Sequence, residues 1–239
     1  MSTTYHISLF EHIHKVEKEH FWFVARNEII RGLLKRFLSD LPHTTFLDIG
    51  CGTGFVMGEV EKLGLRVTGL DVNARALQYA KKVTKGTLVR SSIFSFHPKK
   101  PFDAAGAFDV MEHIPNDKGF LVRCNTVLKP GGFLFLTVPA GQYLWSSVDE
   151  ISGHQRRYSK ERLEQILTQT GFRISSMGYW NSVLVPVYTL WRLISGDTIQ
   201  RYLKKPNYGI NSLLLFLLRL EGIGHFPFGA TLMVVAQKV

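Results

Sequence analysis

LDIGCGTG, residues 47–54, stands between a short apolar run and a segment with helical spacing, and it decides the fold. The run TTFLDIG, residues 44–50, predicts a buried strand, and FVMGEVEKLG, residues 55–64, predicts a helix that ends at a glycine. In open α/β sheets, ligands bind beyond the carboxyl ends of the strands, where glycines let the backbone approach them closely. The stretch therefore predicts a strand, a glycine loop that binds a ligand, and a helix.

Strand-like and helical segments alternate along the chain that follows. Further strands are predicted at 65–71, 87–92, 102–110 and 133–139, and further helices at 74–83 and about 118–128. Strands separated by helices of this length form right-handed βαβ units. The chain is therefore expected to be an α/β protein with a Rossmann-like, doubly wound sheet whose strands run mostly parallel.

The alternation changes after the fifth strand. A helix at 159–171 and a sixth strand at 172–180 come next, and a seventh strand is predicted at 229–239. The last two strands are expected to pair antiparallel at one edge of the seven-stranded sheet, because no long crossover leads back through it. Residues 181–228, rich in Leu, Trp, Tyr and Pro, are expected to form two helices laid over the sheet.

The composition, with 45% hydrophobic and 20% charged residues, is that of an ordinary globular protein. A single domain is expected to span residues 1–239. Its parts are an N-terminal helical cap at 1–43, a ligand-binding core at 44–180, a helical cover insertion at 181–228 and a last strand at 229–239.

Composition also bears on the cellular compartment and the partners of the protein. Two cysteines are too few for a disulfide framework, and the first residues lack the apolar region of a signal peptide, which favours a reduced, cytoplasmic compartment. The apolar runs are shorter than the roughly 20 residues of a membrane-spanning helix. A net charge of +10 favours anionic partners, but the basic residues form neither a block nor a stripe interleaved with aromatic residues, so nucleic acid is not favoured.

Two carboxylates indicate which ligand the glycine loop binds. Asp71 ends the second strand, 21 residues after Gly50, where a carboxylate can accept hydrogen bonds from the hydroxyls of a ribose. Asp48 stands in front of the loop in a D-x-G-x-G-x-G pattern, whereas dinucleotide sites typically show G-x-G-x-x-G. A carboxylate beside the loop would repel a pyrophosphate and attract the ammonium and sulfonium groups of S-adenosylmethionine. An NAD-dependent oxidoreductase shares the ribose acid and stays open as an alternative.

The motifs resemble, in order and spacing, those of the class I, Rossmann-like, S-adenosylmethionine (SAM)-dependent methyltransferases. LDIGCGTG is similar to their first motif, GLDVN to the second and SSIF to the third, while FDAAGAFDVMEHIP and LKPGGFLFLTVP resemble the segments around the fourth and fifth strands. Four further elements resemble a bacterial subgroup of the type-11 and type-23 kind: HFWFVARNEII, GHQRRYS, GYWNSVLVP and PFGATLMVVA. The resemblance covers roughly residues 44–180 and implies a methyltransferase with SAM as its cofactor.

The resemblance also implies roles at the cofactor. The aspartate and glycines of the loop would line its methionine end, and Asp71 would hold the ribose. Ser92 and Ile93 would flank the adenine, and Phe108 and Asp109 would lie beside the sulfonium. The full set of cofactor residues from the core is Asp48, Gly50, Cys51, Gly52, Gly54, Asp71, Val72, Ser92, Ile93, Phe108 and Asp109.

Two further positions concern the cofactor: one departs from the family pattern, and the other lies near the N-terminus. Ser91 stands just before Ser92 where many relatives carry an acid, so the contact to the adenine amine would come from the backbone. Arg26, with Phe21 and Trp22, would close over the cofactor and pair with its carboxylate. The alternative is a surface helix with a buried aromatic face.

The GHQRRYS element follows the fifth strand and would overhang the carboxyl edge, where the methyl group is presented. His154 is the first candidate for a general base acting on a hydroxyl or phenol, and His113 is the second. A carboxylate acceptor would need no base, and Arg156 or Arg157 would hold it by a bidentate fork. In the alternative interpretation, Arg157 and Tyr158 pin the loop to the helix that follows. The residues expected to contact the acceptor are Tyr143, Trp145, Arg156, Arg157 and Tyr158.

A small, lipophilic or aromatic acceptor is favoured, because an apolar cover over the strand ends would form a largely dry pocket. Oxygen is favoured over nitrogen or carbon as the methylated atom. No metal ion is expected, since His12 and His14 would point to different sides of a helix. An RNA methyltransferase or nucleic-acid-binding module stays an alternative, and the oligomeric state stays open.

The cover also carries basic residues that would permit contact with an anionic membrane surface. These are Arg192, Arg201, Lys204, Lys205 and Arg219.

Overall fold

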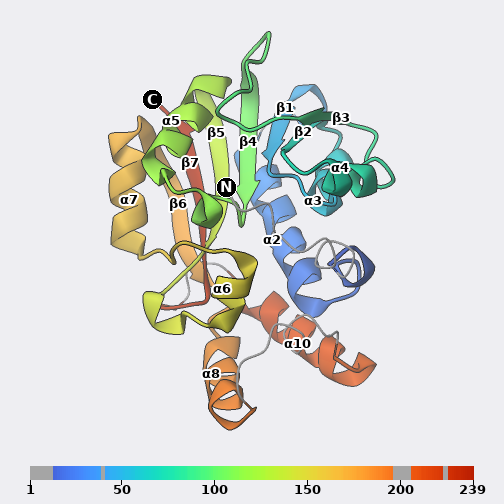
Figure 1. Cartoon of the computed structure of the whole chain (residues 1–239), viewed down its shortest axis with the longest axis vertical. Helices are drawn as coiled ribbons and strands as arrows, with labels where there is room; N and C mark the ends of the chain where they lie inside the picture. Colours follow the sequence, from blue (N-terminus) through green and yellow to red (C-terminus); the bar gives the residue numbers. More distant parts are fainter. Residues whose placement is uncertain (1–12, 39–40, 196–205, 223–225) are drawn as a thin grey trace.

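A computed structural model describes residues 13–38, 41–195, 206–222 and 226–239, and it shows one seven-stranded sheet flanked by helices (Figure 1). The strand order is β3-β2-β1-β4-β5-β7-β6. The strands are β1 (Thr45–Ile49), β2 (Arg66–Asp71), β3 (Thr87–Arg90), β4 (Phe102–Phe108), β5 (Leu128–Pro139), β6 (Phe172–Trp180) and β7 (Thr231–Lys238). The main helices are α2 (Phe21–Phe37), α3 (Phe55–Glu61), α4 (Ala74–Ala80), α5 (Asp117–Val127), α6 (Ser147–Ser152), α7 (Lys160–Gln169), α8 (Leu184–Ser195) and α10 (Tyr208–Glu221).

The first five strands run parallel, and the seventh is reversed. β1 pairs in parallel with β2 and β4, β2 with β3, and β4 with β5. β7 pairs antiparallel with both β5 and β6, so it lies between them and β6 forms the edge. The predicted Rossmann-like sheet, with antiparallel pairing of its last two strands at one side, is confirmed.

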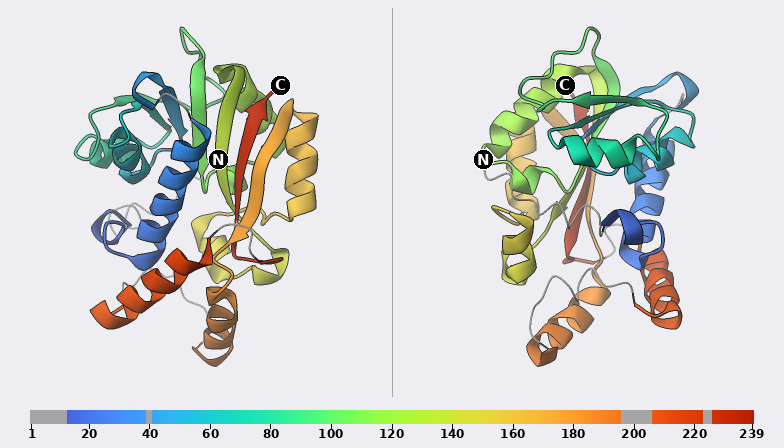
Figure 2. Two further views of the ribbon diagram at one scale, coloured as in Figure 1. Left: turned by 180° about the vertical axis from the view of Figure 1, so that it is seen from behind. Right: turned by 45° about the vertical axis from the view of Figure 1, so that its right-hand side comes forward.

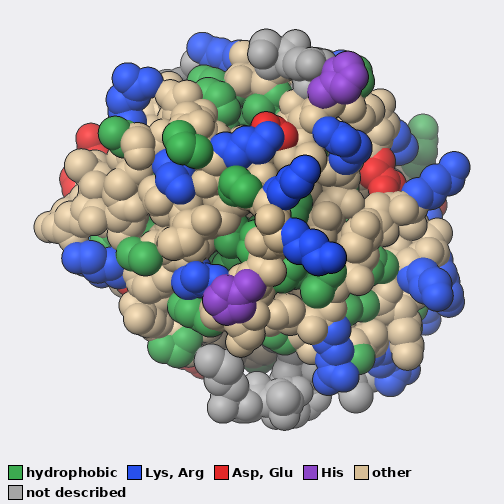
Figure 3. Space-filling model, turned by 90° about the horizontal axis from the view of Figure 1, so that it is seen from above, with side chains coloured by type: hydrophobic (Ala, Val, Ile, Leu, Met, Phe, Trp, Pro, Cys, Tyr) green, Lys and Arg blue, Asp and Glu red, His purple; other side chains and the backbone are tan. Residues whose placement is uncertain are grey.

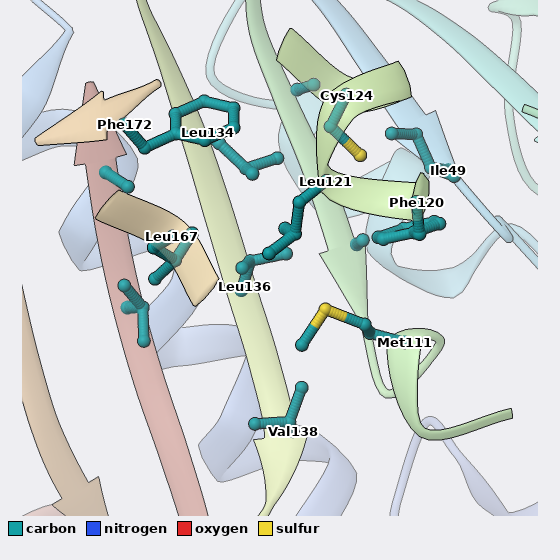
Figure 4. Close-up of a cluster of buried hydrophobic side chains, with 14 of the residues drawn as sticks. Ile49, Met111, Phe120, Leu121, Cys124, Leu134, Leu136, Val138, Leu167 and Phe172 are labelled. Atoms are coloured by element: carbon teal, nitrogen blue, oxygen red, sulfur yellow. The ribbon is translucent and has the colours of Figure 1, made fainter. Parts of the chain in front are cut away.

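Buried side chains cover both faces of the sheet, as a doubly wound sheet requires. On one face, Leu136 of β5 lies in a cluster with Leu121 of α5 and Leu167 of α7 (Figure 4). On the other face, Phe46 of β1 and Phe135 of β5 belong to a cluster with residues of α2 and α3. Each such burial stabilises the fold by about 1.5–3 kcal/mol. The strand ends, and the loops that follow them, are therefore held in fixed positions.

Most strand boundaries differ from the sequence pattern by one or more residues, and those of β3, β4 and β5 bear on the site or the turn before β5. β4 ends at Phe108 because Asp109 has a φ of 57°, in the left-handed region that interrupts a strand. β3 ends at Arg90, two residues earlier than predicted. β5 begins at Leu128, before the glycine turn, because Leu128 already pairs with Phe102.

Helices α8 and α10 lie past the carboxyl ends of the parallel strands rather than on a face of the sheet (Figure 1 and Figure 2). α10 packs on the start of α2, where the Asn211 side chain accepts a hydrogen bond from the Phe21 amide at 3.0 Å and donates one to the Glu19 carbonyl at 2.9 Å. The two described helices of the predicted cover therefore lie at the carboxyl end of the sheet, and α10 lies against α2. No helix within the described ranges has the length and apolarity to cross a bilayer.

Some predicted residues lie outside the described part of the chain. They are His12, Arg201, Lys204 and Lys205.

Candidate active site

The loop after β1 turns through three glycines with positive φ: Gly50 at 71°, Gly52 at 53° and Gly54 at 81°. A Cβ built on Gly50 would lie 2.6 Å from a methyl carbon of Val110, and one on Gly54 would lie 2.9 Å from the Cα of Ala80 in α4. A Cβ on Gly52 would meet no atom of the described residues within 4 Å. Gly52 therefore faces space that a ligand can fill, whereas Gly54 allows close packing against α4.

Asp48 lies near the end of β1, beside this loop, with 2% of its surface exposed. Its Oδ2 has no hydrogen-bond partner among the described residues. Burial, opposed by the Arg26 guanidinium, raises the pKa of the carboxyl to about 8. Buried polar atoms normally have partners, so this carboxylate oxygen fits a ligand that brings a positive charge to the loop.

Asp71, at the end of β2, holds the glycine loop from the neighbouring strand. Its Oδ2 accepts a hydrogen bond from the Gly52 amide at 2.9 Å, and its Oδ1 accepts one from the Asn73 amide at 2.7 Å. Burial raises the pKa of Asp71, and these amide hydrogen bonds oppose that rise. The two carboxylates singled out in the sequence are thus brought to one loop.

Four further residues of the predicted cofactor set divide between surface and core. Val72 is 64% exposed, whereas Ile93 and Cys51 are buried in the two hydrophobic clusters. The Ser92 hydroxyl accepts a hydrogen bond from the Phe94 amide at 3.3 Å, which closes a local turn. Ile93 and Cys51 can therefore offer a ligand their backbone, but their side chains are committed to packing.

Arg26 of α2 reaches the loop after β4. Its guanidinium forms an ion pair with the Asp109 carboxylate and lies over the Trp22 ring, 4.8 Å from the centroid. Asp109 also accepts a hydrogen bond from the Thr137 hydroxyl at 3.1 Å, and Phe108 beside it is buried. The sequence predicts a pair between Arg26 and the carboxylate of the cofactor, but in the structure the partner of Arg26 is Asp109.

The segment before α2 also reaches the glycine loop, which the sequence does not indicate. Glu17, 2% exposed, accepts a hydrogen bond from the Thr53 hydroxyl at 2.5 Å. The His14 ring lies on Tyr79 of α4, with 4.7 Å between ring centroids. Glu17 stands in the charged run EHIHKVEKEH, which has the composition of a solvated helix, so no local signal distinguishes it.

His154 follows α6 and has a buried carboxylate as its partner. Its Nδ1 lies 2.7 Å from Oδ1 of Asp149, whose side chain is fully buried. Burial alone would raise the pKa of Asp149, but hydrogen bonds from His154 and Arg157 lower it to about 2. An ionised carboxylate can only accept, so the contact places a proton on Nδ1 and leaves the lone pair on Nε2. No local sequence pattern marks Asp149 as the partner of His154.

Three residues predicted to contact the acceptor already have contacts within the fold. Arg157 donates from Nε and from a terminal nitrogen to the two oxygens of Asp149, both at 2.9 Å. Arg156 forms an ion pair with Asp117 at 3.2 Å, and Tyr158 is 1% exposed within the core. Their contact with the acceptor stays a prediction. The alternative, in which Arg157 and Tyr158 pin the loop, agrees with the hydrogen bonds of Arg157 and the burial of Tyr158.

Glu112 and His113 face His154 from the turn after β4. The two imidazole rings lie edge to face with 4.8 Å between centroids, and one Glu112 oxygen lies 3.9 Å from Nε2 of His154. Burial, together with nearby His154, lowers the pKa of His113 to about 4, and burial raises the pKa of Glu112. Among the described residues, these three form a group whose candidate metal-ligand atoms lie within 4.8 Å of one another.

The other two predicted acceptor contacts lie between β5 and α6. Tyr143 is 67% exposed, and the indole N–H of Trp145 donates to Glu150 at 3.4 Å. The ring of Tyr143 remains accessible to a ligand.

A cofactor that fits this loop brings a ribose to Asp71 and a positive charge to Asp48, which no pyrophosphate does. That combination fits the cofactor of the class I SAM-dependent methyltransferases better than the dinucleotide of an NAD-dependent oxidoreductase. A family model described as a methyltransferase domain matches residues 21–177, more than half of the chain. The chain belongs to this methyltransferase family, and SAM is its cofactor.

Among curated relatives, the ubiquinone biosynthesis O-methyltransferase of Bradyrhizobium sp. (strain ORS 278) is 35% identical over 105 residues, which are 42% of this chain and 42% of that protein. The protein of the same name from Shewanella halifaxensis (strain HAW-EB4) is 30% identical over 98 residues, which are 38% of this chain and 42% of that protein. The chain thus spans about two-fifths of the length of these relatives.

Solved structures show the same fold. Magnesium protoporphyrin IX methyltransferase from Synechocystis PCC 6803 with bound SAM gives a TM-score of 0.57 at 14% identity, over 91% of this chain and 82% of that one.

Proposed function

We propose that this methyltransferase transfers the methyl group of SAM to a hydroxyl oxygen of a small lipophilic or aromatic acceptor, and that His154 accepts the hydroxyl proton. The contact between His154 and Asp149, 2.7 Å long, carries the proposal. A carboxylate that holds the proton on one imidazole nitrogen leaves the lone pair on the other nitrogen, which suits a general base.

The residues around His154 support this role. SAM supplies a methyl group that is already activated, so the acceptor needs alignment and, if it is a hydroxyl, a route for its proton. Nε2 of His154 takes that proton, and the ionised Asp149 stabilises the imidazolium that results. Arg157 keeps Asp149 in place through its two hydrogen bonds. His113 is a weak base, because burial lowers its pKa to about 4.

Apolar surface at the carboxyl end supports a lipophilic acceptor. Tyr143 before α6 is 67% exposed, Ile151 on α6 is 48% exposed, and Tyr208 at the start of α10 is 85% exposed. Apolar groups around a site favour apolar ligands. The names of the curated relatives, which are O-methyltransferases, support oxygen as the methylated atom.

At the end of the molecule away from the site, the distribution of charge does not indicate a surface for a nucleic acid. Figure 3 looks onto the end of the molecule opposite to α8 and α10, where Lys and Arg side chains are scattered between apolar and other surface. A nucleic acid is held by basic residues that follow its phosphates in a row. We also propose a cytoplasmic location, which the free, buried thiols of Cys51 and Cys124 support.

A turnover assay with a panel of alkylated phenols and aliphatic alcohols tests the proposal, with the methylated product located by mass spectrometry. His154→Ala should lower kcat by about 10²–10⁴-fold and leave the affinity for S-adenosylhomocysteine unchanged. The matched control is His43→Ala, since His43 is an exposed histidine ahead of β1, at the amino end of the sheet. Full turnover by His154→Ala on an identified hydroxyl acceptor would show that the base is assigned wrongly.

A further inference from the structure

Helices α8 and α10 each present a stripe of exposed apolar side chains. In both helices the members stand at positions i, i+3 and i+7, so each stripe runs along one side of its helix. The six residues, each between 55% and 75% exposed, are Val187, Leu190, Ile194, Leu213, Phe216 and Leu220. We call these six residues the apolar stripes.

The stripes are separate from the packing of the fold. The opposite side of α10 already meets the protein through Asn211, which bonds to the start of α2, and through Leu218, which is fully buried beside Trp180. Arg219 at the end of α10 forms an ion pair with Glu28 of α2. Single exposed apolar residues are common on proteins, but two regular stripes on neighbouring helices are a feature of binding surfaces.

The position and length of α8 and α10 suit helices that lie along a lipid surface. Both project from the carboxyl end of the sheet, the same end at which α6 leads into His154 (Figure 1 and Figure 2). With 12 and 14 residues, they are about 18 and 21 Å long, against about 30 Å for the hydrocarbon core of a bilayer. Helices of this length with one apolar side lie along the interface.

We propose that the apolar stripes dock this protein on an anionic lipid surface. An apolar surface can bind a second copy of the chain or a lipid surface, and the net charge of +10 favours an anionic lipid surface. A second copy of the chain carries the same positive charge and is repelled, whereas anionic headgroups attract it. The stripes supply the apolar contact, and docking brings the end that contains His154 towards the membrane. The proposal is independent of which atom is methylated.

Co-sedimentation of the full chain with lipid vesicles tests the proposal. The protein should bind vesicles of phosphatidylcholine and phosphatidylglycerol at least about tenfold more tightly than vesicles of phosphatidylcholine alone. The double variant Leu190→Ser with Phe216→Ser should lose at least about tenfold in binding, because each exposed side chain contributes apolar contact. Val122→Ser, which changes an exposed residue of α5 outside the stripes, should bind like the wild type.

Three results would overturn the proposal. They are a wild-type protein that stays in the supernatant with the mixed vesicles, equal binding to neutral and anionic vesicles, and a double variant that binds like the wild type. A dimer in light scattering that the double variant dissociates would assign the stripes to a second copy instead. The unfolding temperature and the affinity for S-adenosylhomocysteine should stay unchanged in all variants, which separates lost docking from lost folding.

Discussion

Replacing Asp48 by asparagine should remove a pH dependence of cofactor binding. Without ligand, burial holds the pKa of Asp48 at about 8, so this carboxyl is neutral at the acidic end of the physiological range. The ammonium and sulfonium groups of SAM favour the ionised carboxylate. Binding should therefore release the proton, and it should become tighter as the pH rises.

The magnitude follows from the pKa of about 8. A carboxyl with this pKa is ionised in about 1% of molecules at pH ~6 and in about half at pH ~8, so affinity should rise by about 50-fold between them. That change corresponds to about 2.3 kcal/mol. The stability of the ligand-free protein should change in the opposite direction. The pKa of Asp48 is higher in the folded protein than in the unfolded chain. Its carboxyl therefore contributes stability to the fold at low pH, and this contribution is lost as the pH rises through about 8.

Titration calorimetry with SAM across this pH range, in two buffers of different protonation enthalpy, measures affinity and proton release together. Asp48→Asn should bind with no proton release from this position. The amino group of the ligand titrates with both proteins and cancels in the comparison. If the ratio of the wild-type and Asp48→Asn affinities stays constant from pH ~6 to pH ~8, the reasoning about Asp48 is refuted.

Three further predictions concern the loop and the base. Asp71→Ala should weaken SAM binding by about 100-fold in calorimetry, because the ribose loses a charged acceptor, while Glu164→Ala, which changes an exposed acid of α7, should bind normally; equal affinities would contradict the assignment. Gly54→Ala should lower the free energy of unfolding by about 1–3 kcal/mol in urea titrations, because its Cβ would lie 2.9 Å from the Cα of Ala80; an unchanged midpoint would contradict this packing. Methyl transfer should be insensitive to EDTA because His154 acts as a base, and activity that is lost with EDTA and restored by a divalent cation would show a metal requirement.

Local patterns were sufficient to predict the sheet. The strands β1, β2 and β4 are short apolar runs that precede helices with regular spacing, so the order of elements and the handed connections follow from the chain. The placement of α8 and α10 depends on a distant partner, the start of α2, which contributes the Phe21 amide to Asn211. Sequence periodicity shows that such a helix has an apolar side, but it does not show what covers that side.

In the candidate site too, some residues are indicated by local patterns and others are not. Asp48 and Asp71 could be predicted because Asp48 lies in β1 just before the glycine loop and Asp71 ends β2. Asp149 could not, because its local role, a capping box with Ser146 at the start of α6, does not indicate a partner further along the chain. Its partnership with His154 and Arg157 arises when the chain turns back after α6. These contacts join residues only five and eight positions apart, but they depend on the turn after α6, which no helix or strand periodicity indicates.

The central claim is that the loop after β1 accepts a positively charged adenosine cofactor and rejects a dinucleotide. Calorimetry of the purified chain with SAM, with S-adenosylhomocysteine and with NAD⁺ tests it directly. We expect one site for each of the first two ligands and no heat of binding for NAD⁺. Saturable binding of NAD⁺ without binding of SAM or S-adenosylhomocysteine would contradict the account.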